Sequence, residues 1–491
     1  AATERPEEIA LGSRAGGLTF AAVARAARGG ATIVRDRGAR SVVYIGLNGE
    51  SFAVALFAAA AAGVPVVPLN YRLGDDQLRD LLQDLPAPVI IADDPHVARL
   101  DGARTTIPSA DWVSAALDVD APEEVEPVAP DAPAVILFTS GTTSKPKGVV
   151  LTHQQLGSYV VQTVEFASAG PTDVGLTCLP NYHIAGVANL LTSTYAGRRI
   201  AYLADFSAAE WLHMVRAERV TSATVVPTML ARIVDALGGA PAAVPTLRSL
   251  AYGGAPMPAA TIAAALRAFP DTGFVNAYGL TETSSTIAVL GPDDHRAAVA
   301  SGFGAASIRL RSVGRPIPGV EAQIRDAEDR PAAVGEPGRL WVRGPQISGH
   351  YLGSGSALDP EGWFDTRDEG WFDGDGYLYI RGRADDTIIR GSENIAPAEI
   401  EFVLDSFPGA RDAVVVGIPD EEWGERIVAV MVLDDGVVAD AAAVRDHVRS
   451  RLRSSRTPDE VVFRKALPYG STGKLLRNAV RQDVLGAHIQ V

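Results

Sequence analysis

The chain has 491 residues, of which 47% are hydrophobic, and 44 Lys and Arg stand against 59 Asp and Glu, a formal net charge of −15. This length supports at least two domains, and a charged fraction of 21% argues against disorder. The acidic balance disfavours non-specific binding to nucleic acid or anionic membranes, and the single cysteine, Cys178, excludes a disulfide framework. These features predict a multidomain cytoplasmic enzyme without an integral membrane segment.

The first two thirds of the chain predict helices that alternate with strands. A helix is expected over residues 18–38, and the apolar run 52–69 is interpreted as a buried helix ending at Gly63 and a short strand, because glycine and proline interrupt it. The expected strands are residues 41–47, 64–69, 89–92, 134–138, 200–203, 224–226, 249–252 and 274–276. This order predicts crossover connections, a parallel sheet and an α/β fold.

The pattern changes toward the C-terminus. Beyond about residue 319 the expected strands are shorter and richer in glycine, as at 338–344 and 376–383. From residue 397 a helix, two strands, a helix and a strand predict a small α+β domain, with the expected elements at 399–405, 413–416, 427–432, 441–452 and 461–464. The boundary is expected in the charged turn Arg383-Ala-Asp-Asp.

The clearest candidate site is TSGTTSKPKG, residues 139–148, directly after an apolar strand. Small residues allow backbone N–H groups to converge, while hydroxyls and two lysines add donors, which suits a polyphosphate. The segment lacks the Gly-Lys-Ser/Thr triplet of the Walker pattern. A surface hairpin is the alternative interpretation.

Four further segments are weak when taken singly. They are AYGLTET (277–283), LPNYHIAG (179–186), the Asp-rich stretch 362–386 and LPYGSTGKLLR (467–477). Alone, each is compatible with an ordinary turn, a half-buried histidine, hairpin charges or a helix start. Their occurrence together, in this order along the chain, indicates a function rather than five unrelated surface features.

Together these segments resemble the acyl-adenylate-forming superfamily, in its acyl-CoA synthetase branch. The resemblance runs from the first predicted helix to Lys474 and includes SENIAPAEIE, residues 392–401. It implies a large N-terminal domain (1–384) of two α/β subdomains plus a small β-barrel-like segment. A small mobile α+β domain (385–491) would follow, with Asp385 as the hinge and Lys474 as its catalytic residue.

The resemblance also implies a two-step reaction. A carboxylate attacks the α-phosphate of Mg-ATP, giving an acyl-adenylate and pyrophosphate, and the thiol of CoA then displaces AMP. The implied cofactors are ATP, Mg²⁺ and CoA. Two anions must meet in the first step, so positive charge and exclusion of water are required.

By motif match, Lys474 would bridge the carboxylate and the α-phosphate, and His183 would lie at the mouth of the acyl pocket. The implied ATP- and AMP-binding residues are Thr139, Ser140, Gly141, Thr142, Thr143, Lys145, Lys147, Gly254, Ala255, Pro256, Asn276, Tyr278, Gly279, Thr281, Asp368, Ile380 and Arg383. The implied metal-binding residues are Thr139 and Glu282. The residues implied near CoA are Gly391, Ser392, Trp423 and Arg456.

Three positions depart from the family pattern. Ser144, Arg367 and Ser392 each replace a glycine usual in the family. Arg367 stands beside the ribose-binding position, where a bulky cation would alter ATP affinity. The Ser392 side chain would narrow the passage for pantetheine. The sequence therefore leaves open whether the acyl group goes to CoA or to a carrier protein.

The acyl pocket is expected to be small and mostly apolar. Its implied lining is Ile184, Ala185, Asn189, Met229, Gly253, Ser284 and Ser285. No acid stands in residues 183–191 to bind an amine, and the matched positions hold no arginine. The prediction is therefore a fatty or aromatic monocarboxylic acid and a role in fatty acid metabolism.

Alternatives to a CoA ligase are an acyl-AMP ligase that loads a carrier protein, and a non-enzymatic nucleotide-binding protein with this fold. A serine hydrolase is disfavoured, because the chain lacks a Gly-x-Ser-x-Gly elbow. Chain length of the acid, pathway and oligomeric state, including a homodimer, are not readable from the sequence.

Overall fold

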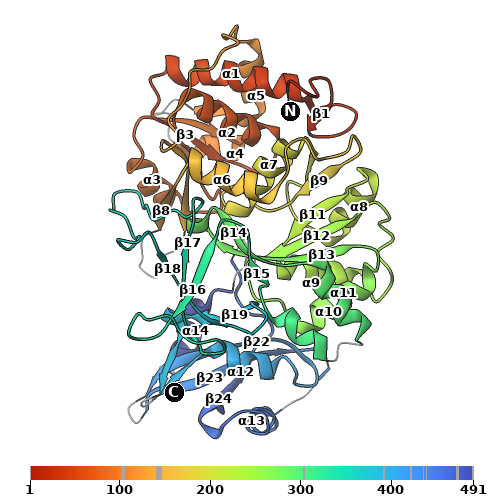
Figure 1. Ribbon diagram of the computed structural model, residues 1–491, viewed down its shortest axis with the longest axis vertical. Coiled ribbons are helices and arrows are strands. Elements are labelled where there is room, and N and C mark those ends of the chain that lie inside the picture. Colours follow the sequence, from red (N-terminus) through yellow and green to blue (C-terminus); the bar gives the residue numbers. More distant parts are fainter. Residues whose placement is uncertain are drawn as a thin grey trace.

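The computed structural model describes residues 2–100, 106–139, 146–301, 305–390, 393–420, 423–434, 436–437, 440–470 and 475–488. Within these ranges the strands form four sheets. Two lie in the upper part of Figure 1, a smaller one lies below them, and the last forms the C-terminal part at the bottom.

The first sheet has six strands in the order β6-β5-β3-β4-β7-β8. Its strands are β3 (Ser41–Ile45), β4 (Val66–Pro68), β5 (Pro88–Ala92), β6 (Thr106–Pro108), β7 (Pro133–Thr139) and β8 (Lys147–Thr152). The accompanying helices are α1 (Phe20–Asp36), α2 (Glu50–Ala62), α3 (Asp75–Gln83), α4 (Asp94–Val97), η1 (Ala98–Leu100) and α5 (Ser109–Asp118). All pairings are parallel except β7 with β8, so the predicted parallel sheet ends in an antiparallel hairpin.

The second sheet has nine strands in the order β15-β14-β13-β12-β11-β9-β10-β1-β2. Its strands are β1 (Ile9–Leu11), β2 (Leu18–Thr19), β9 (Val174–Thr177), β10 (Arg199–Tyr202), β11 (Ser222–Val225), β12 (Ser249–Gly253), β13 (Gly273–Leu280), β14 (Ser285–Leu290) and β15 (Arg315–Pro316). The helices here are α6 (His153–Thr163), α7 (Ile184–Ala196), α8 (Ala208–Ala217), α9 (Pro227–Leu237), α10 (Ala259–Ala268), η2 (Thr281–Thr283), α11 (Pro292–Ala300) and η3 (Ala305–Arg311).

Two smaller sheets complete the fold. The expected β-barrel-like segment is an antiparallel sheet of β16 (Glu321–Arg325), β17 (Gly338–Arg343), β18 (Phe364–Phe372) and β19 (Leu378–Arg383). The C-terminal sheet has β20 (Ile388–Arg390), β21 (Glu393–Ile395), β22 (Ala410–Asp420), β23 (Gly424–Leu433) and β24 (Glu460–Phe463). Its helices are η4 (Ala384–Asp386), α12 (Pro397–Leu404), α13 (Ala441–Arg449), η5 (Ser454–Arg456) and α14 (Arg477–His488). The α/β class and the large-plus-small organisation are confirmed.

Local chemistry explains where the first helices begin and end. The Thr19 hydroxyl accepts a hydrogen bond from the Ala22 N–H at 3.1 Å and so caps α1. As predicted, α2 ends at Gly63, whose φ of +75° is the left-handed conformation that glycine adopts without strain. Both helices pack on the first sheet around the fully buried Trp112.

The strand expected over residues 274–276 is longer than predicted. β13 continues to Leu280 and pairs with β14 before η2 begins, so part of the segment 277–283 is strand rather than turn. The pairing of Tyr278 with Ala288 keeps this segment in the sheet. Cross-strand hydrogen bonds, invisible in the local sequence, override the turn preference of glycine here.

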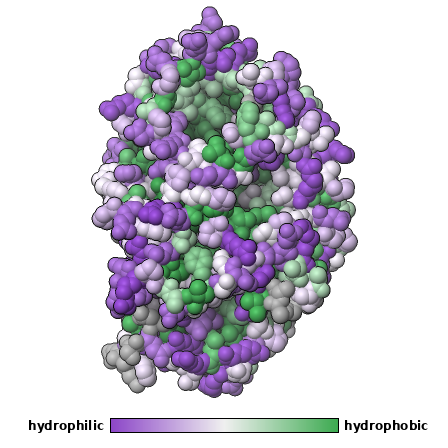
Figure 2. All heavy atoms as spheres, in the orientation of Figure 1, coloured by the Kyte–Doolittle hydropathy of each residue, from purple (hydrophilic) through white to green (hydrophobic). Residues whose placement is uncertain are grey.

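The face shown in Figure 2 has the mixture of hydrophilic and hydrophobic residues that is usual for a folded protein. On the face in Figure 2, hydrophilic residues cover most of the rim and hydrophobic residues gather in hollows along the middle. Within the described ranges, no helix combines the length and apolar content needed to cross a bilayer.

A buried histidine makes the second sheet sensitive to acid. The Gly291 carbonyl can only accept, so Nδ1 of the His295 ring donates to it at 2.7 Å, and Nε2 lies 2.9 Å from the Tyr252 hydroxyl, from which the neutral ring accepts. Burial lowers the pKa of His295. The unfolded chain therefore takes up a proton first as the pH falls, and stability present above the ordinary pKa of about 6.5 is lost below it.

We expect the urea midpoint of unfolding to fall between pH 7.5 and pH 5.0, and His295→Gln to reduce this fall, because the titrating ring is gone. Exposed His213 on α8 provides the control His213→Gln, which should leave the pH dependence as in the original chain. An unchanged pH dependence in His295→Gln would show that other groups cause the acid sensitivity.

Candidate active site

A buried polar cluster joins three strands from the second and third sheets. Asp368 on β18 is 6% exposed, accepts a hydrogen bond from the Tyr278 hydroxyl of β13 and lies 3.1 Å from Nε of Arg383 on β19. Asp368 and Arg383 are direct cross-strand partners, and Arg383 also donates to the Thr366 carbonyl at 2.9 Å. Burial, followed by the Asp368 charge, raises the pKa of Tyr278 well above its usual value. The predicted adenine- and ribose-binding residues thus lie in one cluster.

The predicted adenine segment runs beside this cluster. Gly253 ends β12 and pairs with Ala277 of β13, whose carbonyl oxygen would lie 2.1 Å from a Cβ at position 253. Only glycine permits this approach. The next residue, Gly254, has φ of +84°, so the chain turns immediately before Ala255 and Pro256. The predicted Asn276, Gly279 and Ile380 stand on β13 and β19.

The predicted phosphate loop connects β7 with β8. Thr139, the last residue of β7, pairs with Lys147, the first of β8, and its hydroxyl donates to the Lys147 carbonyl at 3.4 Å. Ser140, Gly141, Thr142, Thr143 and Lys145 lie outside the described residues, as does Ser144. The described ends of this segment therefore pair as the two arms of a hairpin, and phosphate binding by the residues between them stays a prediction.

The hairpin lies beside Glu282, the predicted Mg²⁺ ligand. Val149 of β8 forms a bridge with Tyr351, whose hydroxyl donates to Glu282 Oε1 at 3.1 Å and whose ring lies 5.8 Å from the Lys147 ammonium. No bond to Glu282 Oε2 is recorded in the part of the chain that is described, which suits a hard cation that also binds substrate phosphates. Thr281 precedes Glu282 in η2. The predicted nucleotide residues thus converge from segments more than 100 positions apart.

His183 caps the helix that carries three of the seven predicted acyl-pocket residues. Its Nδ1 accepts from the Ala185 N–H at 3.3 Å at the start of α7. Ile184 and Ala185 form the first turn of that helix, and Asn189 accepts from Thr177 at 2.7 Å. Met229 stands in α9, and Ser284 and Ser285 join η2 to β14 with positive φ values.

Arg367 contacts the predicted hinge. Its guanidinium lies 3.5 Å from the Asp385 carboxylate in η4, and its φ is +59°, a conformation that favours glycine. The positive φ explains why glycine suits position 367, and the ion pair with Asp385 gives the arginine side chain a partner of opposite charge. Both side chains are largely exposed, so the pair adds little stability.

The predicted CoA residues stand in the C-terminal part. Trp423 is 45% exposed beneath the Arg390 guanidinium, and Arg456 forms ion pairs with Glu393 and Glu399. Gly391 and Ser392 lie outside the described residues. The two described positions offer an aromatic face and a cation.

Lys474 also lies outside the described residues. Tyr469 and Gly470, which precede residues 471–474, line a cavity of about 300 Å³ together with residues of the two large sheets. Met229 is the predicted acyl-pocket residue in that lining. The buried Cys178 also lines the cavity, and burial raises its pKa to about 12, so it remains a thiol at neutral pH.

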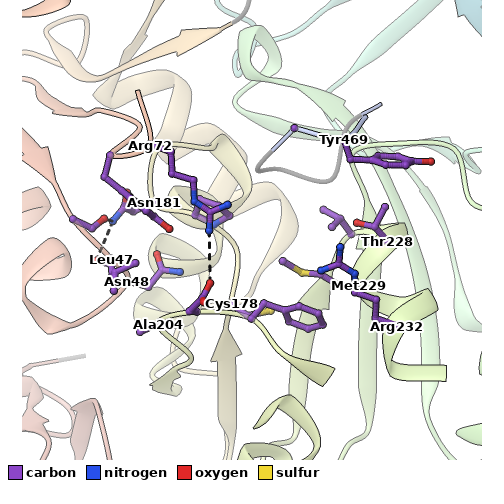
Figure 3. A pocket seen from close by; sticks show the side chains of 17 residues that line it. Leu47, Asn48, Arg72, Cys178, Asn181, Ala204, Thr228, Met229, Arg232 and Tyr469 are labelled. Atoms are coloured by element: carbon purple, nitrogen blue, oxygen red, sulfur yellow. Dashed lines mark hydrogen bonds and ion pairs between the residues drawn. The ribbon is translucent and has the colours of Figure 1, made fainter. Parts of the chain in front are cut away.

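Sequence reasoning missed two arginines in this cavity. Arg72 follows β4 and Arg232 stands on α9, and both reach toward the middle of the pocket in Figure 3. An isolated arginine in a turn or on a helix is usually a solvated charge, so no local signal marked either residue. Sequence reasoning also missed Tyr351, because its importance comes from its contact with Glu282, which no local sequence pattern shows.

The polar cluster supports a prediction about ATP. Asp368→Asn removes the carboxylate that offsets Arg383, so the KM for ATP should rise about tenfold to a hundredfold, the range for a lost hydrogen bond to a charged group. The measurement is ATP-dependent pyrophosphate release. Asp375→Asn, at an exposed carboxylate in the turn of the same β18–β19 hairpin, should behave like the original chain. Equal effects of both changes would contradict a specific role for Asp368.

The hairpin, Glu282 and the Tyr278–Asp368–Arg383 cluster bring the predicted nucleotide-binding residues together in an α/β protein. A family model described as "AMP-binding enzyme" matches residues 1–352, and one described as "AMP-binding enzyme C-terminal domain" matches residues 399–474. The chain belongs to this family. The predicted membership of the acyl-adenylate-forming superfamily, in its acyl-CoA synthetase branch, is confirmed. The prediction that the chain is an AMP-forming acid–thiol ligase is also confirmed. The alternatives of a non-enzymatic binding protein and a serine hydrolase are therefore set aside.

Similar proteins cover nearly the whole chain. Feruloyl-CoA synthase of Amycolatopsis sp is 35% identical over 477 residues, 95% of this chain and 94% of its own. Fatty acid–[acyl-carrier-protein] ligase ScoC of Streptomyces coeruleorubidus is 32% identical over 461 residues, 91% and 87% of the two chains. The structure of o-succinylbenzoate CoA synthetase (MenE) from Bacillus subtilis in complex with the acyl-adenylate OSB-AMP has a TM-score of 0.84 at 28% identity, covering 98% of this chain and 96% of that chain.

Proposed function

We propose that this chain activates a carboxylic acid with ATP to an acyl-adenylate and transfers the acyl group to the thiol of CoA, releasing AMP and pyrophosphate. The observation that carries this proposal is the convergence of the Tyr278–Asp368–Arg383 cluster with the β7–β8 hairpin and Glu282. These groups offer a base-stacking ring, hydroxyl partners and phosphate donors in one place.

In the first step the chain must bring an acid carboxylate to a triphosphate. Thr139, Lys147 and the loop between them would hold the phosphates, and Lys474 would offset the charge at the α-phosphate. Asp368 and Arg383 would fix the ribose, while Tyr278 and residues 254–256 would hold the adenine. Mg²⁺, held by Glu282 and the phosphates, would screen their charge.

In the second step the proposed C-terminal domain, residues 385–491, would rotate about Asp385. This movement would withdraw Lys474 and bring Trp423 and Arg456 to the pantetheine arm. A single lid would then serve both half-reactions. The domain boundary and the hinge are part of the proposal.

For the acid, we favour an aliphatic or aromatic carbon skeleton, the fatty or aromatic class expected from the mostly apolar acyl-pocket positions. The names of the feruloyl and fatty-acid relatives support this class. The restriction to a single carboxylate rests only on the lack of arginine at those positions. A cytoplasmic location goes with the proposal, because the cytoplasm supplies both ATP and CoA.

The second candidate is an acyl-AMP ligase that loads a carrier protein. The relative named as an acyl-carrier-protein ligase and the serine at position 392 favour it. A screen of pyrophosphate release over a panel of carboxylic acids, followed by AMP release with CoA or with a phosphopantetheinylated carrier, separates the two. AMP release that requires the carrier would overturn the CoA assignment, and absence of pyrophosphate release with every acid would overturn both.

A further inference from the structure

The cavity of about 300 Å³ lies where several strands of the two large sheets end. Its lining combines the segments that follow β3, β4, β9, β10 and β11 with residues of α9 and with Tyr469 and Gly470. Residues 46, 178, 204 and 226 lie within two positions of the carboxyl ends of β3, β9, β10 and β11. The carboxyl ends of parallel strands are the usual ligand-binding edge of α/β folds.

This cavity adjoins the groups expected to do the chemistry. Asn181 is two residues before His183, and Met229 belongs to the predicted acyl pocket. Tyr469 and Gly470 come directly before residues 471–474, which include Lys474. An acid bound in this cavity can therefore extend from the reacting carboxylate near those groups into the pocket.

Two cations face each other across the cavity. Arg72 and Arg232 extend from opposite walls toward its centre (Figure 3). Arg72 lies 3.6 Å from the Asp205 carboxylate, a pair whose side chains are 51% and 81% exposed. For Arg232, neither a hydrogen bond nor an ion pair is recorded among the described residues. In a chain with net charge −15, one unpaired guanidinium and a second with a weakly held partner make this cavity locally cationic.

The other polar groups in the lining are mostly occupied. The Asn48 amide donates to the Leu179 carbonyl at 2.8 Å, and the Asn181 amide donates to the Gly46 carbonyl at 3.0 Å. Asn181 Oδ1 is buried without a recorded partner and can accept from a bound water or hydroxyl. The charged donors left for a ligand are therefore the two guanidinium groups, and the Thr228 hydroxyl also lines the cavity.

We propose that this cavity receives the far end of the acid substrate, and that Arg232, assisted by Arg72, binds a second anionic group there, a carboxylate or a sulfonate. The inference rests on the proposed function and replaces its restriction to a single carboxylate. The planar guanidinium matches a carboxylate through two parallel hydrogen bonds, so it discriminates against an acid that lacks the group. A volume at the low end of ligand cavities favours a compact acid over a long fatty chain.

The test compares acids that share a skeleton and differ in the second carboxylate, for example hexanoate with adipate and 4-phenylbutanoate with 4-(2-carboxyphenyl)butanoate. Pyrophosphate release is measured without CoA, so that the acceptor plays no part. The original chain should prefer the better dicarboxylate by at least about tenfold in kcat/KM. Arg232→Met should lower kcat/KM for that acid about tenfold to a hundredfold and change its monocarboxylate partner less than about threefold. Arg232→Lys should keep part of the preference, because the charge remains.

The matched control is Arg267→Met, which removes an exposed arginine at the end of α10. It should leave both acids unchanged, and circular dichroism should show that each variant is folded. A preference for monocarboxylates, or an Arg232→Met variant whose preference equals that of the original chain, overturns the inference while leaving the ligase function in place. A change in the KM for CoA alone overturns it too, because the arginine would then serve the acceptor. Absence of pyrophosphate release with every acid is instead a failure of the proposed function.

Discussion

Replacing Lys474 with alanine is expected to abolish adenylate formation, with a fall of at least about 10²- to 10³-fold, the range for removing one group that stabilises a developing charge. The reacting carboxylate and the α-phosphate are both anionic, and the proposed ammonium offsets their repulsion. The second half-reaction uses a preformed acyl-adenylate, so thioester formation from supplied acyl-adenylate and CoA should change little. The two measurements are pyrophosphate release and CoA-dependent AMP release.

Lys465→Ala is the control for this experiment, because Lys465 is an exposed lysine of the same C-terminal part. It should leave both half-reactions as they are in the original chain. Equal loss of both half-reactions in Lys474→Ala would contradict the proposed division of labour. So would retention of adenylate formation.

Arg477→Met is expected to unfold the C-terminal part more readily and to impair adenylate formation through the nearby Lys474. The Arg477 guanidinium forms two bonds with Glu401, at 2.5 and 3.2 Å, and also donates to the Val415 carbonyl. It lies 3.4 Å from Asp386 in η4, so it also connects α14 with the predicted hinge. Without the arginine, Glu401 is left half-buried with an uncompensated charge, and such losses cost about 3 to 5 kcal/mol.

Urea unfolding followed by circular dichroism measures the loss of stability, and pyrophosphate release measures the functional effect. Arg449→Met provides the matched control, because Arg449 forms an exposed pair with Asp446 at 2.8 Å. Removing that pair should change stability by less than about 1 kcal/mol. Similar destabilisation by both substitutions would show that the Arg477 contacts contribute no more to stability than an exposed ion pair does.

Local sequence patterns were sufficient for many elements. The helix ending at Gly63 is confirmed, because an apolar run followed by glycine depends on interactions within a few residues. The strand before residue 139 is confirmed for a similar reason, since its apolar residues are continuous. The length of β13 could not be predicted, because its last residues are held by β14 rather than by their own preferences.

The sequence by itself determined the class of this protein, because the spacing of the phosphate loop, the hinge and the segment ending at Lys474 is carried along the chain. It could not determine which charges meet across the fold. Asp368 and Arg383 share a register in one hairpin, whereas Arg72 and Arg232 reach a common cavity from the turn after β4 and from α9. Side chains distant in sequence become neighbours only when strands pair and helices pack. The tertiary structure therefore supplied the juxtaposition of the two arginines on which the proposed second-anion site rests.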